Sequence, residues 1–433
     1  MPLLNTSSEI QPEIAAWRQA LHSRPELMFD VHETAKFVSE KLRAFGCDEV
    51  VTGIGRTGIV GLIRGRHGEG PVIGLRSDMD ALPIVEATGL AYASQIPGRM
   101  HACGHDGHMA MLLGAARHLC ETRNFRGAVA VIFQPAEEGG GGGREMVADG
   151  MMERFGITQV FGLHNEPGIP AGRFSIRTGA MLAAYDEITI QVRGRGGHAA
   201  MPHQTIDPIF IGAQIITALQ GIVSRNTDPV ESLVVSITKF HAGDAMNVIP
   251  PAAELAGTVR TLSKDIRDAA ETRIRETVEN VAKALGGEAT LAYVRKYPVT
   301  INHAAETQLA IAAAREVMGS GAIETEARPI MGAEDFAFML EARPGAMINL
   351  GNGDTAYCHS PDYDFNDEII PVGLSYWVRL AEMVLKPVII PLDSAGQSVI
   401  WRISGSSIMC PEPAAAGHIA FDILHLPEQG TVT

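Results

Sequence analysis

The stretch MHACGHDGHMA, residues 100 to 110, gathers three histidines, one cysteine and one aspartate within eleven positions. Imidazole nitrogens and a thiolate sulfur are typical ligands of divalent transition metals such as zinc. The same residue types also suit a thiol nucleophile with a histidine base, or polar side chains at the start of a helix. These residues alone leave the three interpretations open.

Further residues of types that bind metal ions follow apolar segments elsewhere in the chain. Asp78 and Asp80 end one such segment in RSDMDALP. Glu137 and Glu138 follow a second in QPAEEGG, and His164 ends a third in GLHNEP. Open α/β sheets build their sites at the carboxyl ends of strands, so we expect these side chains to meet the opening stretch. An adjacent glutamate pair is more often a solvated turn, but its place directly after an apolar strand favours a site.

This set of histidine, cysteine and carboxylate ligands suits Zn²⁺, Mn²⁺ or Co²⁺, and the number of ligands suits two ions. A metal pair can bind and acidify water while it polarises a carbonyl group. A glutamate that is not a ligand would then act as general base and move the proton of the water to a leaving nitrogen. The chemistry that the residues predict is hydrolysis of an amide.

The elements that must position these residues alternate between helical periodicity and short apolar segments, which predicts an α/β sheet. Helices are expected at 7–22, 32–46 and 106–121, with Gly46 as the cap of the second, and strands at 58–65, 71–78, 128–135 and 159–165. From about residue 185 the order becomes strand, helix, strand, strand, helix, strand. This is the ferredoxin-like βαββαβ arrangement. Helical and strand signals of the first kind return at 304–319, 345–351 and 366–385.

We therefore predict a catalytic domain formed by residues 1–184 and 298–387, and an inserted domain of residues 185–297. Residues 388–433 contain short apolar segments without a sustained period. We interpret them as an appended C-terminal tail that catalysis does not need. Pro387 ends the preceding helix.

The composition narrows the class of protein. A length of 433 residues exceeds one ordinary core, and 46% hydrophobic with 20% charged residues is normal for a globular enzyme. A formal net charge of −15 argues against a nucleic-acid partner. The five cysteines have no regular spacing that would predict a disulfide framework. The start MPLLNTSSEI does not resemble a signal peptide, and no apolar segment approaches the ~20 residues of a membrane span. We expect a cytoplasmic protein that binds neither nucleic acid nor a membrane.

The sequence resembles the metallo-amidohydrolases that include aminoacylases, hippurate hydrolases and plant hydrolases of auxin–amino-acid conjugates. The matching motifs are LRSDMDALP, MHACGHDGHMAMLLGAA, FQPAEEGGGG, GLHNEP, GRGGHAAMPH, NVIP, GAEDFA and CHSPDYDF. They run in order from about residue 15 to 385, so the resemblance covers nearly everything except the tail. It implies a metallo-exopeptidase-like catalytic domain with a mixed sheet flanked by helices, and an inserted ferredoxin-like domain that serves as lid and dimerisation domain.

The resemblance also implies a role for each matching residue. Glu137 matches the general base, and Asp80 matches an aspartate that orients a ligand from behind. His198 matches a histidine that reaches the active site of the partner subunit and stabilises the oxyanion of the tetrahedral intermediate. The implied metal ligands are Cys103, which bridges the two ions, His105, Glu138, His164 and His359.

Asn247 and Arg260 match inserted-domain positions that are associated with binding the carboxylate of the substrate. The planar guanidinium of arginine is well suited to bind a carboxylate. We read His101, Asp106 and His108 as helix-start and supporting residues. The implied cofactors are two divalent metal ions per subunit, zinc or manganese first, with cobalt and nickel as alternatives. The implied assembly is a homodimer or a homotetramer.

The leading hypothesis is a metal-dependent amidohydrolase that cleaves N-acyl amino acids into a carboxylic acid and a free amino acid. Benzoyl-glycine, acetylated amino acids, acetyl-diaminopimelate and indole-acetyl conjugates all remain possible substrates. One alternative is a catalytically inactive dimeric binding protein of the same fold. Another is a thiol hydrolase with Cys103 as nucleophile, which the nearby carboxylates disfavour because they raise the pKa of a thiol.

Overall fold

The computed structural model describes residues 5–386, 403–404 and 407–408. The chain divides into two units, residues 1–386 and 387–433. In the second unit, the described residues are the antiparallel strands β17 (Ile403–Ser404) and β18 (Ser407–Ile408). The predicted tail of residues 388–433 otherwise lies outside the described residues, and its dispensability stays a prediction.

The first unit contains a mixed sheet of eight strands in the order β1-β2-β4-β3-β5-β16-β6-β15. Strand β3 pairs in parallel with β4 and β5, and β5 pairs in parallel with β16, whereas β2 is antiparallel to β1 and β4. The strands are β1 (Glu49–Ile54), β2 (Gly58–Arg64), β3 (Val72–Asp78), β4 (Ala128–Gln134), β5 (Ile157–Pro167), β6 (Phe174–Ser175), β15 (Ile323–Glu324) and β16 (Gly345–Gly353).

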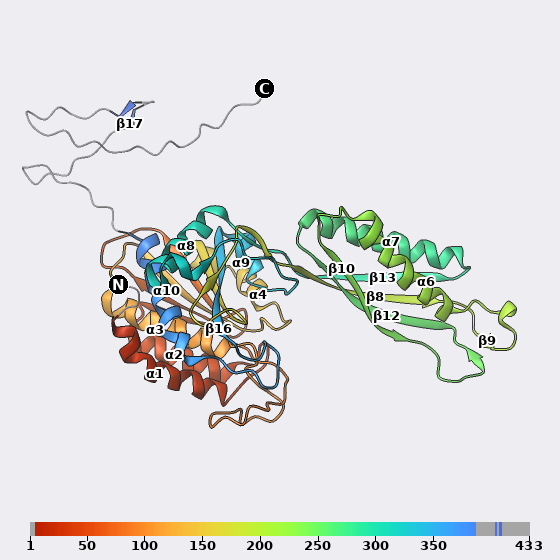
Figure 1. Ribbon diagram of the computed structural model, residues 1–433, viewed down its shortest axis with the longest axis horizontal. Coiled ribbons are helices and arrows are strands. Elements are labelled where there is room, and N and C mark those ends of the chain that lie inside the picture. The colour runs from red at the N-terminus through yellow and green to blue at the C-terminus, as the bar shows by residue number, and fades with distance from the viewer. Residues whose placement is uncertain (1–4, 387–402, 405–406, 409–433) are drawn as a thin grey trace, which may run out of the picture. The chain divides into compact units, whose positions relative to one another are not determined.

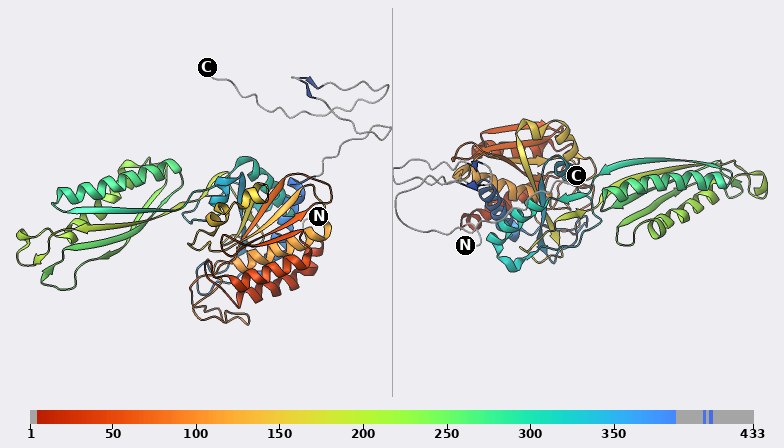
Figure 2. Two further views of the ribbon diagram at one scale, coloured as in Figure 1. Left: turned by 180° about the vertical axis from the view of Figure 1, so that it is seen from behind. Right: turned by 90° about the horizontal axis from the view of Figure 1, so that it is seen from above.

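Helices cover both faces of this sheet because its central strands are apolar on both sides. In β4, Val129, Val131 and Phe133 pack into one core, while Ala130 and Ile132 pack into the other. The first core includes residues of α1 (Asn5–His22), α2 (His32–Phe45), α3 (His105–Thr122), α8 (Ala304–Met318) and α10 (Ile370–Val384). The second includes residues of α4 (Gly142–Ala148), α5 (Met151–Arg154) and α9 (Ala337–Ala342). Helices α1, α2 and α3 lie side by side (Figure 1, Figure 2).

Helix α2 shows how the sequence sets these elements. Val38 and Leu42 lie one turn apart and are both fully buried. Gly46 ends the helix with a φ of 84°, a conformation that glycine adopts without strain, as the sequence predicted. Of the helices within residues 5–386, none combines the length and apolar character that a membrane crossing requires.

A separate sheet of four strands, in the order β10-β12-β8-β13, forms the inserted part. All neighbouring strands are antiparallel, and α6 and α7 lie together on one face (Figure 1). The elements are β8 (Ala184–Arg193), α6 (Pro208–Gly221), β10 (Leu233–His241), β12 (Ala252–Thr261), α7 (Lys264–Ala284) and β13 (Glu288–Tyr297). The predicted fold, a mixed sheet flanked by helices with an inserted βαββαβ unit, is confirmed.

Two short strands connect the inserted part to the large sheet. Strand β7 (Gly179–Leu182) precedes β8, and β14 (Thr300–Asn302) follows β13. The two strands pair with each other in antiparallel fashion, so both connections leave the catalytic part side by side. We keep 185–297 as the proposed limits of the inserted domain.

A buried ion pair fastens α7 to the inserted sheet. Asp186 on β8 is 1% exposed and Arg267 on α7 is 8% exposed. The Arg267 Nε donates to the Asp186 carboxylate at 3.0 Å, and the Tyr293 hydroxyl donates to the same carboxylate at 2.6 Å. Removing one partner of such a pair leaves the other charge buried without compensation.

We predict that Asp186→Ala lowers the free energy of unfolding by about 3–5 kcal/mol, because Arg267 loses its buried counter-charge. Chemical denaturation of purified protein measures the change. The control is Asp268→Ala, which removes solvent-exposed ion pairs with Lys264 and Arg295 and should leave stability near wild type. Equal stability of the two variants would contradict the prediction.

Candidate metal centre and active site

Polar side chains from several segments meet at the carboxyl edge of the parallel strands. Each segment follows a strand, ends one or begins a helix. The residues are Asp80 after β3, Cys103 and His105 at the start of α3, Glu137 and Glu138 after β4, His164 on β5, and His359 after β16.

These residues form two groups of ligand atoms that share Cys103. In one group, Cys103, His105 and His164 place one ligand atom each within 4.8 Å of one another. In the other, Cys103, Glu138 and His359 do the same. The Cys103 Sγ lies 3.5 Å from the His164 Nε2, and the His359 Nε2 lies 3.4 Å from the Glu138 Oε1. The structure therefore brings the five predicted ligands together.

Hydrogen bonds prepare two of the imidazoles to bind a cation. The His105 Nδ1 donates to the backbone carbonyl of Asp80 at 2.7 Å, and the His164 Nδ1 donates to the backbone carbonyl of Asn165 at 2.5 Å. Each Nε2 then carries a lone pair. The His105 Nε2 is buried and has no hydrogen-bond partner among residues 5–386, which is costly unless a cation binds there. The donor set thus fits divalent transition metals.

His108 lies in this cluster but supports it in another way. Its Nδ1 donates to Asp78 at 2.7 Å, and its Nε2 accepts the backbone N–H of Asn165 at 2.9 Å. Burial lowers the pKa of His108 to about 4, so the ring is neutral. The Asn165 side chain in turn donates to the carbonyl of Cys103 at 2.7 Å. Because both ring nitrogens are engaged, His108 positions the segments of Cys103 and His164.

Asp80 contacts both the ligands and the glutamate loop. Its backbone carbonyl accepts the hydrogen bond from the His105 Nδ1. Its carboxylate accepts the backbone N–H of Glu137 at 2.9 Å and that of Glu138 at 3.2 Å. The side chain therefore fixes the backbone that presents both glutamates.

Glu137 lies in an acidic, buried environment that affects its proton affinity. Burial, Glu334 and Glu138 raise the pKa of the Glu137 carboxyl well above its ordinary value. Arg76, which is 1% exposed, opposes this effect and donates to Glu334 at 2.8 Å. A carboxylate with a raised pKa is a stronger base, which suits it to accept a proton.

A cavity of about 620 Å³ opens onto this cluster. Its lining includes the predicted ligands Cys103 and His359 and, from the inserted part, Arg260, Tyr185 and Tyr297. The guanidinium carbon of Arg260 lies 4.1 Å from the centre of the Tyr185 ring. The Arg260 Nε is buried and has no hydrogen-bond partner among the described residues. The Arg260 Nη1 donates to the carbonyl of the preceding residue, Val259, at 3.5 Å, a long contact, so the guanidinium keeps donor groups that a ligand in the cavity can use.

The structure does not bring the other two inserted-domain candidates to this cavity. His198 lies on β9 (Gly197–His198), which pairs with β11 (Val248–Ile249). Asn247 precedes β11, and its carbonyl accepts the N–H of Ala199 at 3.0 Å. Both side chains are exposed, and neither belongs to the described lining of the cavity. They share a location with each other and not with Arg260.

Sequence reasoning left several cavity residues without a role. Glu334 was inside the quoted motif GAEDFA, and Cys358 directly precedes His359. The signal that the sequence offered for Glu334 was an acidic residue inside one of the matching motifs. Tyr185 and Tyr297 stand at the two ends of the predicted inserted domain, where no sequence pattern marks them.

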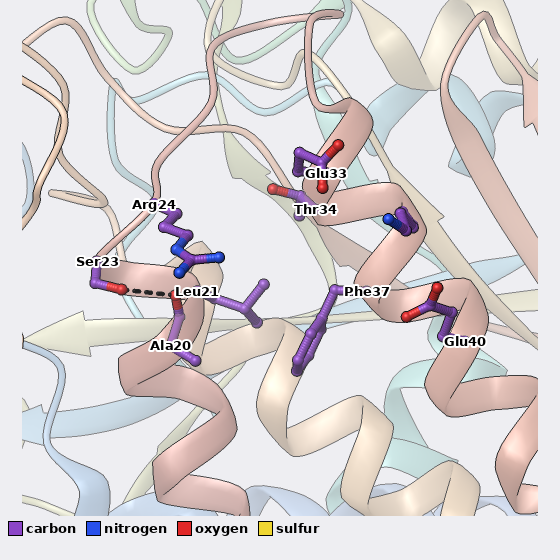
Figure 3. A pocket seen from close by; sticks show the side chains of 9 residues that line it. Ala20, Leu21, Ser23, Arg24, Glu33, Thr34, Phe37 and Glu40 are labelled. Carbon is purple, nitrogen blue, oxygen red and sulfur yellow. Dashed lines mark hydrogen bonds between the residues drawn. The ribbon is translucent and has the colours of Figure 1, made fainter.

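A second cavity, of about 340 Å³, lies between the end of α1 and the start of α2 (Figure 3). Leu21 and Phe37 form its apolar wall, with Arg24 and Glu33 beside them (Figure 3). None of the residues that the sequence predicts for catalysis or metal binding lines it. The predicted metal ligands and Glu137 lie instead at the carboxyl edge of the large sheet.

Comparison with known proteins agrees with this geometry. The model of peptidase family M20/M25/M40 matches residues 74–383. The chain belongs to this family. It is 42% identical over 386 residues to the hippurate hydrolase of Campylobacter jejuni, across 89% of this chain and 100% of the relative. It is 38% identical over 372 residues to the N-acetylcysteine deacetylase of Bacillus subtilis, across 86% of this chain and 96% of that protein.

A solved structure shows the same fold. The YXEP protein of Bacillus subtilis, a dinuclear metal-binding peptidase of the M20 family, aligns with a TM-score of 0.78 and 35% identity. The alignment covers 88% of this chain and 100% of that one. The resemblance read from the sequence is confirmed, as is the reaction class, metal-dependent hydrolysis of an amide. The family and the ligand groups support a centre for two divalent metal ions.

We predict that Asp80→Asn weakens metal binding by about 10- to 100-fold, since residues that support metal ligands have effects of this size. The amide has one acceptor oxygen and cannot hold both N–H groups of the glutamate loop. Titration of metal-free protein against a chelator of known affinity measures the change. Asp30→Asn, at an exposed position, is the control. Unchanged affinity in Asp80→Asn would remove this role.

Proposed function

We propose that this enzyme hydrolyses the amide bond of N-acyl amino acids and releases a carboxylic acid and a free amino acid. The observation that carries the proposal is the cavity, which combines the ligand groups and Glu137 with the guanidinium of Arg260. The names of the hippurate hydrolase and N-acetylcysteine deacetylase relatives describe substrates of this class.

The residues that would hold two divalent ions are those of the two groups that share Cys103. One group is Cys103, His105 and His164, and the other is Cys103, Glu138 and His359. Bound metal ions supply Lewis-acid polarisation of a carbonyl group and lower the pKa of water. Thiolate, imidazole and carboxylate ligands suit zinc or manganese, with cobalt and nickel as alternatives.

Glu137 is the proposed general base. It accepts a proton from the attacking water and returns the proton to the leaving amide nitrogen. Its raised pKa favours the first transfer, because a carboxylate with a higher proton affinity is the stronger base. Arg260 binds the carboxylate of the amino-acid part through its planar guanidinium. Asp80 keeps the backbone of the base in place through the two N–H groups that it accepts.

A Cys103 nucleophile fits these observations less well. The neighbouring Cys358 thiol, burial and the Glu138 carboxylate raise the pKa of the Cys103 thiol well above its ordinary value. A nucleophilic cysteine requires the opposite shift. Removal of metal by a chelator, followed by dialysis, separates the two: activity lost with metal and restored by adding it back supports the metal enzyme.

We predict that Glu137→Gln keeps the metal content of wild type and lowers turnover by about 10²- to 10⁴-fold, the contribution of a general base. Metal analysis and kinetics on the same preparation measure both. Glu145→Gln, on nearby α4 and outside the cavity lining, is the matched control and should retain full activity. Lost metal, or activity within about tenfold of wild type, would assign Glu137 to another role.

A homodimer with shared active sites is the proposed assembly. The inserted part has large apolar side chains that are exposed in the single chain, among them Ile209 and Phe210 on α6 and Val234 and Phe240 on the edge strand β10. An edge strand with exposed apolar side chains supports a contact surface there, because its outer backbone groups can pair with another chain. His198 and Asn247, which lie outside the chain's own cavity, would enter the cavity of the partner subunit. A homotetramer built from such dimers is the alternative.

We propose a cytoplasmic location. The four described cysteines are free thiols. A reducing compartment keeps thiols in this state.

We predict that His198→Ala retains both metal ions and lowers turnover by about 10²- to 10³-fold, the effect of losing one oxyanion donor. Mixing inactive His198→Ala with inactive Glu137→Gln should then regenerate activity, because one site of the mixed dimer has an intact Glu137 and the partner's intact His198. Two affinity tags identify the mixed dimers. His203→Ala, a neighbouring exposed histidine, is the control. Mixed dimers without recovered activity would contradict the shared site.

A further inference from the structure

The loop that presents Glu137 has a backbone that needs external support. Ala136, directly before Glu137, has a φ of 54°, in the left-handed region that disfavours residues with a Cβ. Its side chain is fully buried. Backbone strain of this kind persists only where neighbouring contacts hold it. The contacts of this loop therefore decide where the base lies.

Two side chains hold the loop from different parts of the molecule. Asp80, in the catalytic part, accepts the backbone N–H groups of Glu137 and Glu138. Tyr297, the last residue of β13, donates its hydroxyl hydrogen to the carbonyl of Glu137 at 2.7 Å. The same hydroxyl oxygen accepts the N–H of Gly141 at 3.2 Å. Tyr297 is 4% exposed, so water does not substitute easily for these bonds.

Tyr297 is also the end of a row of side chains across the inserted sheet. Tyr185 on β8 pairs directly with Arg260 on β12 on one side and with Tyr297 on β13 on the other. The Tyr185 and Tyr297 rings meet edge to face, with centroids 6.2 Å apart and an interplanar angle of 88°. The Arg260 guanidinium lies over the Tyr185 ring. Direct contacts thus connect Arg260 to the backbone of Glu137.

We propose that Tyr297 is a positioning residue that couples recognition of the substrate's carboxylate at Arg260 to the placement of Glu137, with Tyr185 as the link. This inference rests on the proposed function. A carboxylate bound by Arg260 fixes the guanidinium on the Tyr185 ring. That ring fixes the edge of Tyr297, and the Tyr297 hydroxyl fixes the carbonyl of the base. Part of the binding energy of the carboxylate is then used in turnover instead of ground-state affinity.

A merely structural hydroxyl would behave differently. It would lower stability and affect every substrate equally. A coupling residue changes kcat more than KM, and its effect depends on whether the substrate has the carboxylate. Misplacement of a reacting group by about 1 Å costs about 10²-fold in rate. Loss of the Tyr297 hydroxyl can therefore lower the rate strongly if it displaces Glu137.

The first test is Tyr297→Phe in the full-length, metal-loaded enzyme. The substrate is the N-acyl amino acid that wild type hydrolyses fastest in a panel. We expect kcat to fall by about 10- to 100-fold with KM changed by less than about threefold and metal content unchanged. The matched control is Tyr293→Phe on the same strand, which loses a hydroxyl bonded to Asp186 and should keep its kcat. Unchanged kcat in Tyr297→Phe would overturn the proposal.

The second test compares that substrate with its carboxamide, in which the charge is absent. Tyr297→Phe should reduce kcat/KM less for the carboxamide than for the charged substrate. With the charged substrate, the effects of Arg260→Met and Tyr297→Phe should be less than additive, as for residues that share one interaction. Equal losses on both substrates, or fully additive losses, overturn the coupling. If wild type cleaves no member of the panel, the proposed function itself fails, which is a separate outcome.

Discussion

The fully buried Arg76 makes the acidic edge of the large sheet possible. Its guanidinium donates to Asp78 at 2.8 Å, to Glu334 at 2.8 Å and to Asp335 at 3.1 Å. Carboxylates this close would repel one another or take up protons in a buried environment without a cation. Arg76 lies on β3, so the strand that leads to Asp80 also supplies the charge that stabilises the acids around it. The cluster of predicted metal ligands depends on this arrangement of charges.

Around Arg76 and its acids, the segments of the site are held in place mainly by hydrogen bonds between side chains and backbone groups. Asp78 holds the neutral His108, whose other nitrogen accepts the backbone N–H of Asn165. Asn165 then fixes the carbonyl of Cys103, and Asp80 fixes the N–H groups of the glutamate loop. Each supporting side chain thus holds the main chain of a segment that presents a ligand or the base. A small displacement in one segment is resisted by the others, as pre-organised sites require.

Much of this could be predicted from the sequence, for an identifiable reason. Short apolar segments that end in polar residues predicted both the sheet and the edge at which the side chains of Asp80, Glu138 and His164 meet. The pattern gave no signal for contacts that depend on register between distant strands. Tyr185 and Tyr297 are 112 positions apart and meet only because β8 and β13 pair in one register. The paired connections β7 and β14 were also missed, since they are short and lack a period.

The inserted sheet also has a length that bears on the roles of its two ends. Its strands place Tyr185 opposite Arg260, whereas Arg193, at the other end of β8, pairs with Ala252. At about 3.4 Å per residue, residues 185 to 193 span about 27 Å. That distance is far larger than a side chain's reach. Arg260 lines the chain's own cavity, so His198, which follows the far end of β8, needs a different cavity to act upon. The distance is therefore the physical reason that the role proposed for His198 requires the site of a partner subunit, whereas Tyr297 contacts residues of the chain's own cavity.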